Sequence, residues 1–531
     1  MHDVVIIGSG AGGGPLAFEL ARAGLDVLVL EKGPRFRREQ YTREAHGLAP
    51  GAFTPDLASD PHTVVTRKTR TPLRTTLGWI ACCVGGGTTH MGGYFYRFHR
   101  DDFRMRQRFG AKPLDTVELV DWPYSYEDLE PYYTRAEWEI GVAGQAGADP
   151  SEGHRSRPYP LPPVDAHPLA VPLEKVCRRK GLSPFPTPRS INSRPYQGRP
   201  ACAYCETCAG LGCPVGARGS TQEALLPRAE ATGRCKVRSQ STVCEVLVDR
   251  SGRVSGCVYR DSDGKEHEVA ARIVCLCASA IESARLLLLS RSPRFPDGLA
   301  NSTGLVGRHL QFHGVTQGEA RLPLDQPPGD LLQRRHVFLG RSVSDFYFLP
   351  AGVSPLAKGG MLRFGMASQQ APGSPAGVGH ESRRGLIGCE IFHDFLPNTG
   401  TWMELDDEVC DRWGSPVARI HLDRPQHHVT AGRWVLGRAF EVFQDLGAVA
   451  LRATDVGGTS SYLVQGTCRA GRDPRTSVLN EYCQAHEVSN LFVVDGSFMP
   501  TSGGTPPTLT ILANSFRTAQ HIVERWKSAD F

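Results

Sequence analysis

The chain has 531 residues, which is too long for one hydrophobic core, so we expect at least two domains. Its 60 basic and 55 acidic side chains leave a formal net charge of only +5, which gives no sign of a nucleic-acid partner. No stretch approaches 18 uninterrupted apolar residues, so no membrane span is predicted.

The first 31 residues predict one β–α–β unit. An apolar strand at 4–7 leads into Gly8-Ser-Gly10-Ala-Gly-Gly13, a helix follows at 17–23, and a second strand ends just before Glu31. The three glycines permit a tight turn, close approach of the backbone to a pyrophosphate, and close helix–strand packing, while Glu31 can accept hydrogen bonds from a ribose. We therefore predict a dinucleotide site, and its position at the start of a long chain without a second such unit favours resident FAD.

The compartment is inferred from the N-terminus and the cysteines. The chain starts directly in its first apolar strand, with no basic segment or cleavage site ahead of it, so no export signal is predicted. Sixteen cysteines are spread unevenly, and the adjacent Cys82 and Cys83 cannot form an ordinary bridge with each other. Reduced thiols in the cytoplasm are the better interpretation.

The rest of the chain divides by composition and periodicity. Residues 34–80 are rich in Pro, Thr and Arg and predict a long surface excursion, and residues 144–200 mark a domain transition. Alternating runs between 242 and 274 predict a β-meander, followed by a strand at 273–276 and a helix at 280–289, as a second pass through the first domain. The expected substrate domain spans about 312–450, with strands at 361–366, 386–392 and 417–422 and a helix at about 429–446.

A family resemblance is carried by the C-terminal run 490–514, which contains Val-Val-Asp495-Gly496-Ser and Thr505-Pro506-Pro507-Thr508. This run resembles the glucose–methanol–choline (GMC) oxidoreductases, in particular the gluconate-dehydrogenase-like and cholesterol-oxidase-like branches. Blocks at 84–90, 97–103, 303–310 and 466–471 match in the same order along the chain. The resemblance implies an α/β fold: an FAD/NAD(P)-binding Rossmann-like domain from residues 1–140, 200–310 and 455–531, a substrate-side excursion at 141–199, and an antiparallel-sheet substrate domain at 311–454.

The resemblance also implies which residues hold FAD. Asp495 is placed to accept from the ribityl hydroxyls, Gly496 leaves its amide close to the cofactor, and Pro507 opens a helix from Thr508 to about Trp526 whose positive end points at the flavin N1–C2=O edge. Further cofactor contacts are expected at Gly85, Gly86 and Val243. His90 stands where some members of the family carry a histidine bonded covalently to the flavin, and whether it does so here stays open.

The catalytic pair of the family is absent. Members usually oxidise an alcohol of a small substrate by hydride transfer to flavin N5, with a histidine and a second His or Asn holding the hydroxyl. The corresponding positions here are Leu463 and Pro506. Several alternatives stay open: Tyr462, Gln465 or Thr505 supplies the polar contact; a base comes from His90, His313 or His428; the reaction is a desaturation or a redox-neutral conversion; or the chain is a non-catalytic flavin-binding scaffold.

A cysteine run follows the domain transition. Cys202, Cys205, Cys208 and Cys213 have the spacing C-x2-C-x2-C-x4-C-P, one residue from that of bacterial ferredoxins. An iron–sulfur cluster there would give the flavin a one-electron outlet to a separate electron acceptor. Structural zinc, reduced thiols or disulfides within a rigid loop are the alternatives.

Overall fold

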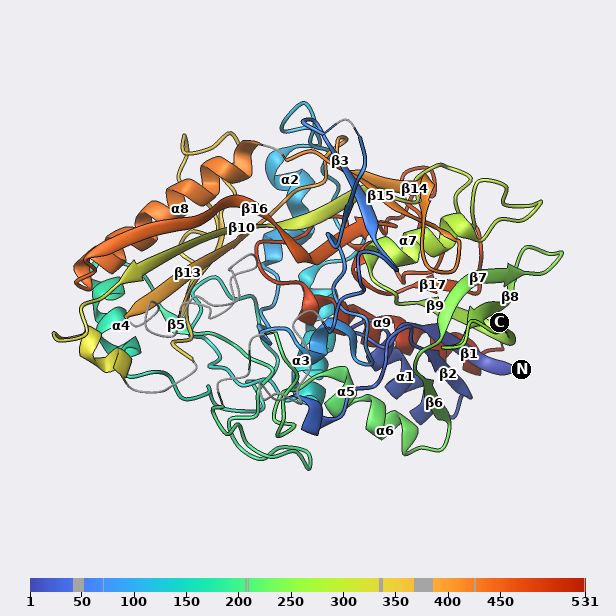
Figure 1. Ribbon diagram of the computed structural model, residues 1–531, viewed down its shortest axis with the longest axis horizontal. Helices are drawn as coiled ribbons and strands as arrows, with labels where there is room; N and C mark the ends of the chain where they lie inside the picture. Colours follow the sequence, from blue (N-terminus) through green and yellow to red (C-terminus); the bar gives the residue numbers. More distant parts are fainter. Residues whose placement is uncertain are drawn as a thin grey trace.

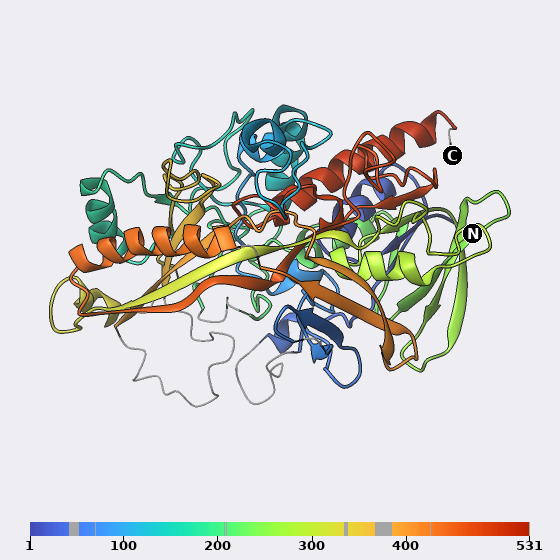
Figure 2. The same cartoon turned by 90° about the horizontal axis from the view of Figure 1, so that it is seen from above.

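The computed structural model describes residues 1–41, 52–69, 71–205, 208, 210–333, 338–366, 385–424, 426–529 and 531 (Figures 1 and 2). Strands of these residues form three sheets, of seven, six and four strands. Both chain ends lie at the same end of the molecule, beside the seven-stranded sheet (Figure 1). The two segments that the sequence assigns to one cofactor are therefore neighbours.

The seven-stranded sheet combines strands from the two ends and the middle of the chain. Its order is β6 (Cys235–Arg238), β2 (Val27–Leu30), β1 (His2–Ile7), β9 (Glu266–Leu276), β8 (Val254–Arg260) and β7 (Thr242–Val248), with β17 (Leu491–Val493) also paired to β9. β1 pairs in parallel with β2 and β9, and β17 pairs in parallel with β9. Central parallel strands are covered on both faces, which explains the uninterrupted apolar runs at 4–7 and 27–30. The Rossmann-like fold is thereby confirmed.

β9 is shared by the antiparallel and the parallel parts of the seven-stranded sheet. Its first half pairs antiparallel with β8, and its second half pairs in parallel with β1. Side chains alternate between exposed and covered in the first half, whereas residues 273–276 are all buried. The last strand of the predicted meander and the predicted strand at 273–276 are therefore one continuous strand, β9.

Three long helices hold the two ends of this domain together. α9 (Thr508–Lys527) packs against α1 (Gly13–Arg22) and α3 (Tyr126–Ile140), and it lies above the sheet in Figure 2. The Ser515 hydroxyl of α9 donates to the carbonyl oxygen of Gly12 at 2.5 Å. α7 (Ala280–Leu289) has the bounds that the sequence predicts, whereas α1 begins four residues before its predicted start. Among the helices of the described residues, none combines the length and the apolar character needed to cross a bilayer.

The six-stranded sheet is antiparallel. Its order is β16 (Ala450–Thr467), β10 (Arg308–Arg321), β13 (Leu386–His393), β12 (Gly360–Met366), β11 (Arg341–Val343) and β5 (Phe185–Pro186). α8 (Gln426–Asp445) packs on β10, β13 and β16, and α4 (Ala170–Arg179) packs on α8. The antiparallel sheet implied by the family resemblance is present. The sequence-based boundary at 454/455 falls inside β16.

The four-stranded sheet differs from the sequence-based expectation. It consists of β14 (Trp402–Cys410), β15 (Pro416–Leu422), β3 (His62–Thr66) and β4 (Leu73–Thr75). β3 and β4 come from the segment interpreted as a surface excursion, and β3 pairs in parallel with β15. Because β4 has only three residues and the partner strand of β3 lies about 350 residues away in the chain, local periodicity gave no signal of this pairing.

Within the described ranges, the remaining helices are short. They are α2 (Met105–Phe109), α5 (Thr221–Ala224) and α6 (Leu226–Glu230), with 3₁₀ turns at Arg38–Gln40, Gly86–Thr89, Arg100–Arg104, Gly329–Gln333 and Gly496–Phe498.

A bulge in β16 shapes the region between the two larger sheets. Phe312 of β10 pairs with Val464 of β16, and Gly314 pairs with Thr459. One residue of β10, His313, thus stands opposite the four residues 460–463 of β16. Extra residues on one strand interrupt the ladder and bend that strand locally. The bulge contains Tyr462 and Leu463.

Buried histidines make the fold sensitive to acid. Burial lowers the pKa of His313 to about 4, of His393 to about 3 and of His427 to about 4. The neutral forms are thus favoured in the folded state, whereas an unfolded chain protonates its histidines near pH 6.5. The stability these groups contribute is therefore complete above pH 6.5 and is lost as the pH falls toward 4.

We predict that the free energy of unfolding falls between pH 6.5 and pH 5, by about 2 kcal/mol for each such histidine. Denaturant titrations at a series of pH values would measure it. The variant His427→Gln should show a shallower pH dependence than the wild type, and His154→Gln, at an exposed position, should not. Equal slopes for all three proteins would contradict this assignment.

Candidate active site

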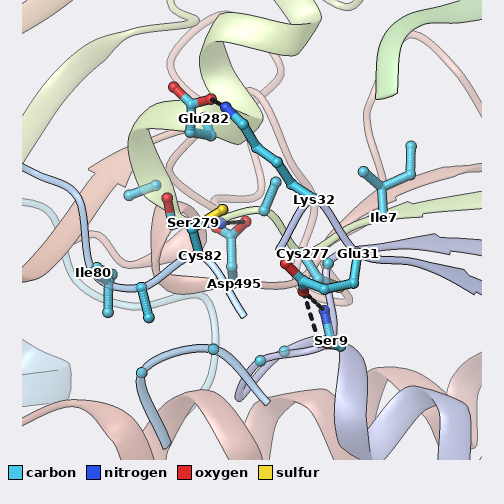
Figure 3. A pocket seen from close by; sticks show the side chains of 18 of the residues that line it. Ile7, Ser9, Glu31, Lys32, Ile80, Cys82, Cys277, Ser279, Glu282 and Asp495 are labelled. Carbon is cyan, nitrogen blue, oxygen red and sulfur yellow. Dashed lines mark hydrogen bonds and ion pairs between the residues drawn. The ribbon is translucent and has the colours of Figure 1, made fainter. Parts of the chain in front are cut away.

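A cavity lies where the seven-stranded sheet meets the N-termini of α1 and α9 (Figure 3), and its volume is about 1420 Å³ when its opening to solvent is included. Its walls come from segments far apart in the chain, namely 7–12, 30–32, 79–82, 86–88, 241–244, 277–280, 462–464, 495–496 and 507–508. Of the predicted cofactor residues, the ones that line it are Gly8, Gly10, Glu31, Gly86, Val243, Asp495, Gly496, Pro507 and Thr508. Gly13, Gly85 and His90 are not among its lining residues in the described part of the chain.

The first turn is built from contacts that only glycine allows. Gly8 has φ +100°, and a Cβ there would lie 2.3 Å from the carbonyl oxygen of Cys277. A Cβ at Gly13 would lie 1.9 Å from the carbonyl oxygen of Gly8, so Gly13 acts through helix–strand packing and not through the cavity wall. α1 starts at Gly13 with no acidic residue in its first turn. Its positive end is therefore available to an anion in the cavity.

Glu31 stabilises this turn through hydrogen bonds. Its Oε2 accepts hydrogen bonds from the Ser9 amide (3.0 Å) and the Ser9 hydroxyl (2.6 Å), and its Oε1 accepts from the Gly33 amide (2.9 Å). Burial raises the pKa of Glu31. The Ser9 hydroxyl oxygen also accepts from the Gly85 amide at 2.9 Å. Ser9, which the sequence analysis did not single out, thus joins the first turn to the second glycine loop.

The second glycine loop lies directly against the first. Gly85 and Gly86 have positive φ values, and a Cβ at Gly86 would lie 3.0 Å from the Cα of Gly10. His90, at the end of this loop, donates from Nε2 to the Ile80 carbonyl at 3.0 Å and stacks on Phe53 with ring centroids 4.6 Å apart. Burial lowers the pKa of His90 to about 4. The Nε2 atom and one face of the His90 imidazole therefore already have partners within the protein.

The C-terminal segment supplies the opposite wall. Asp495 accepts from the amides of Ser279 (3.1 Å) and Ser497 (2.9 Å) and from the Ser283 hydroxyl, and burial raises its pKa. A Cβ at Gly496 would lie 2.7 Å from the Val464 carbonyl oxygen, so this position requires glycine. α9 starts at Thr508, also without an acidic residue in its first turn. Two uncompensated helix N-termini thus face one cavity.

A charged network forms the outer wall near Glu31. Lys32 Nζ lies 3.7 Å from Glu282 and 4.5 Å from the centre of the Trp79 ring, and it also pairs with Asp60 (Figure 3). Burial alone would raise the pKa of Glu282, but Arg285 and Lys32 hold it below its ordinary value. The sequence analysis missed this network because its members are dispersed along the chain without a recognisable spacing.

The region around the missing catalytic pair contains one continuous hydrogen-bonded chain. His313 donates from Nε2 to the Thr505 carbonyl at 2.7 Å, and its Nδ1 accepts from the Gln465 amide at 3.1 Å. Both nitrogens of His313 are therefore in use. Leu463 and Tyr462 line the cavity, and Tyr462 is 37% exposed. His428 donates from Nδ1 to the Asp394 carbonyl at 3.1 Å and is not a cavity residue in the described part of the chain.

The cysteine run does not have the geometry of a metal site. Among the described residues, which include all four cysteines, no three His, Cys, Asp or Glu side chains are placed to hold a metal ion. Cys202 Sγ accepts from the Tyr204 amide at 3.3 Å, and no disulfide links the described cysteines. Arg218, fully buried, instead ties this loop to the second glycine loop, since it donates to the carbonyls of Cys208, Leu211 (2.8 Å) and Thr89 (2.9 Å). Among the described residues the structure therefore gives the iron–sulfur and zinc interpretations no support.

Glycine turns and two helix N-termini converge here on one cavity in a Rossmann-like sheet, which defines a dinucleotide-binding protein. Residues 73–315 and 403–515 match the two parts of the GMC oxidoreductase family, and residues 3–67 match an FAD binding domain. The chain belongs to the GMC oxidoreductase family and is an FAD-dependent enzyme.

Relatives match over nearly the full length. The chain is 33% identical to 6'''-hydroxyparomomycin C oxidase of Streptomyces lividus, over 98% of this chain and 91% of that protein. It is 30% identical to 2-methyl-1,2-propanediol dehydrogenase of Mycolicibacterium austroafricanum, over 99% and 95% of the two chains. Among solved structures, formate oxidase of Aspergillus oryzae superposes with a TM-score of 0.67 at 15% identity, over 100% and 99% of the chains. This structural similarity supports the assignment of the fold.

We predict that Gly10→Ala weakens FAD binding by about 10-fold or more without destabilising the apoprotein. A Cβ at Gly10 has the Cα of Gly86 as its nearest neighbour at 3.7 Å, an ordinary contact, but Gly10 lines the cavity where the backbone must approach the pyrophosphate. FAD titration of the apoprotein and its thermal unfolding would measure the two effects.

Gly437→Ala is the matched control, because a Cβ there meets no atom within 4 Å and the residue lies in α8, away from the cavity. Unchanged FAD affinity in Gly10→Ala would contradict the assignment of this turn to the pyrophosphate.

Proposed function

We propose that the enzyme holds one FAD in the large cavity and dehydrogenates a CH–OH group of a small organic substrate, with the electrons leaving to a separate acceptor. The observation that carries this proposal is the convergence of two helix N-termini, α1 and α9, on one cavity, neither compensated by an acidic side chain in its first turn. The N-terminus of α1 suits a pyrophosphate, and the N-terminus of α9 suits the anionic edge of a reduced flavin.

Each wall then has a role toward the cofactor. Gly8 and Gly10 admit the pyrophosphate, Glu31 receives the ribose of the adenosine half, and Val243 covers the adenine. Asp495 receives the ribityl hydroxyls, and Gly496, Pro507 and Thr508 lie at the flavin ring. The bound flavin supplies a two-electron acceptor at N5.

The proton of the substrate hydroxyl needs its own route, because dehydrogenation removes a hydride from carbon and a proton from oxygen. Neither Leu463 nor Pro506 can take it, and both nitrogens of His313 already have partners. Tyr462 lies in the β16 bulge next to Leu463, lines the cavity and is partly exposed. We assign to Tyr462 the hydrogen bond that holds the substrate hydroxyl and hands its proton toward solvent.

The names of the relatives support a hydroxylated small substrate. They include the two proteins above and the fructose dehydrogenase large subunit of Gluconobacter japonicus, which is 29% identical over 99% of this chain. Oxidases and dehydrogenases both occur among them, and the absent His/Asn pair favours a reaction that differs in its proton step. The alternative is therefore a flavin-dependent desaturation or redox-neutral conversion in the same cavity.

A cytoplasmic location belongs to the same proposal. It is supported by the sixteen cysteines, among which the described structure forms no disulfide.

We predict that Tyr462→Phe lowers the limiting rate of flavin reduction by about 10- to 100-fold while FAD content stays unchanged. The rate is measured by anaerobic stopped-flow absorbance with a panel of primary and secondary alcohols, across a range of pH. Ser461→Ala, in the same bulge, controls for disturbance of β16 and should behave as the wild type.

The same experiment separates the alternatives. Rapid bleaching of the flavin by any alcohol supports dehydrogenation of a CH–OH group. If no alcohol in the panel reduces a fully loaded enzyme that dithionite does reduce, the proposed dehydrogenation is wrong and the alternative conversion takes its place. A dye acceptor that reoxidises the flavin faster than oxygen would support a separate acceptor.

A further inference from the structure

The six-stranded sheet ends at β16, and no strand of the described residues pairs with the outer side of β16. Figure 1 shows the first residues of β16 at the end of the molecule opposite the two chain ends. Residues 450 and 452–455 are exposed, whereas the strand is buried from Val464 onward. The N–H and C=O groups along such an edge can pair with a strand of another chain. The segment 450–456 is therefore a candidate interaction surface.

A bulge brings two opposite charges to one face of this edge. Arg452 pairs with Glu319 of β10, and Asp455 pairs with Gln317. Glu319 and Gln317 are two residues apart on β10, so their side chains point to the same face of the sheet. Between these two pairs β16 contains one residue more than β10, which the bulge accommodates. Arg452 and Asp455 therefore share one face, although they are three residues apart.

Apolar side chains of the same segment lie on the opposite face. Leu451 pairs with the buried Ala320, and both Leu451 and Val456 pack against the hydrophobic core between the sheet and α8. The sequence Leu451-Arg-Ala-Thr-Asp-Val456 thus has an apolar residue at each end and one charge of each sign inside. Read in reverse, the segment has the same order of apolar, charged and small residues, with the signs of the two charges exchanged.

This symmetry suits an antiparallel contact with a second copy of the chain. When two β16 strands pair about a two-fold axis that passes between residues 453 and 454, Arg452 of each copy faces Asp455 of the other, and Leu451 faces Val456. The facing side chains lie on matching faces, because this axis is perpendicular to the sheet. We propose that β16 forms a homodimer interface of this kind, which joins two six-stranded sheets into one.

The charges favour a second copy over an unrelated strand. Charged side chains on an edge strand usually hinder pairing with other strands. Here they oppose any register that brings like charges together, and they attract each other in the self-paired register. The Arg452 Nη2 atom lies 2.6 Å from Glu319 Oε2 and the side chain is 72% exposed, so other N–H groups of its guanidinium remain for a second carboxylate. Asp455 is exposed and forms no ion pair with another described residue.

The proposed contact is separate from the cofactor. In the described part of the chain, β16 contributes only residues 462–464 to the lining of the FAD cavity, and none from 450–456. Changes in the segment 450–456 should therefore alter association of the subunits without altering FAD content.

Charge reversal tests this pairing in the FAD-loaded enzyme, by sedimentation velocity over a dilution series. The wild type should be a dimer that dissociates on dilution. Arg452→Asp and Asp455→Arg each place like charges opposite each other, twice in every interface, and each should raise the dissociation constant by about 10-fold or more. The double variant Arg452→Asp/Asp455→Arg exchanges the charges and should restore the wild-type constant to within about 3-fold. Asp455→Arg keeps the Arg452–Glu319 pair, so it tests the interface even where Arg452→Asp lowers stability.

Arg475→Asp is the matched control, because Arg475 forms an exposed ion pair with Asp473 in the loop between β16 and β17. It should dimerise as the wild type does, and thermal unfolding and FAD content should confirm that every variant is folded. A wild type that stays monomeric throughout the series would overturn the proposal. Single reversals that leave the dissociation constant unchanged, or a double variant no tighter than the single ones, would contradict it equally.

Discussion

The structure depends on a close approach between the first turn of the chain and its last strand. A Cβ at Gly12 would lie 2.2 Å from the carbonyl oxygen of Val494, and the Ser515 hydroxyl of α9 donates to the carbonyl of Gly12. Backbones can meet at this distance only where a side chain is absent. The contact joins segments about 480 residues apart and brings the N-termini of α1 and α9 to one cavity.

The contact between Gly12 and Val494 places different groups on the nucleotide side and on the flavin side of the cavity, and these groups decide its chemistry. On the nucleotide side, Glu31 and Ser9 fix the turn, and neither helix has an acidic residue in its first turn. On the other side, Pro507 and Thr508 line the cavity at the start of α9. His313 ties the segment 505–507 to β16 through Thr505 and Gln465, so it positions the two segments that carry the family's catalytic pair in other members.

Sequence patterns predicted the parts of the fold whose signals are local. The glycine turn, the uninterrupted apolar strands and the proline-opened helix at 508 each have a direct physical cause within a few residues. The four-stranded sheet was not predicted, because β3 and β15 are distant in the chain. The bulge at 460–463 was not predicted either, because the register of β16 is defined only by its pairing with β10. For the cysteine run, the spacing allows a ligand set, and the described residues give that interpretation no support.

The most direct test of the account is amide hydrogen exchange of the apoprotein with and without added FAD. Saturating FAD should slow exchange together in residues 8–13 and in residues 495–511, because both segments close around one cofactor. Slowing in only one of these segments, or a protein that takes up no FAD at all, would contradict it.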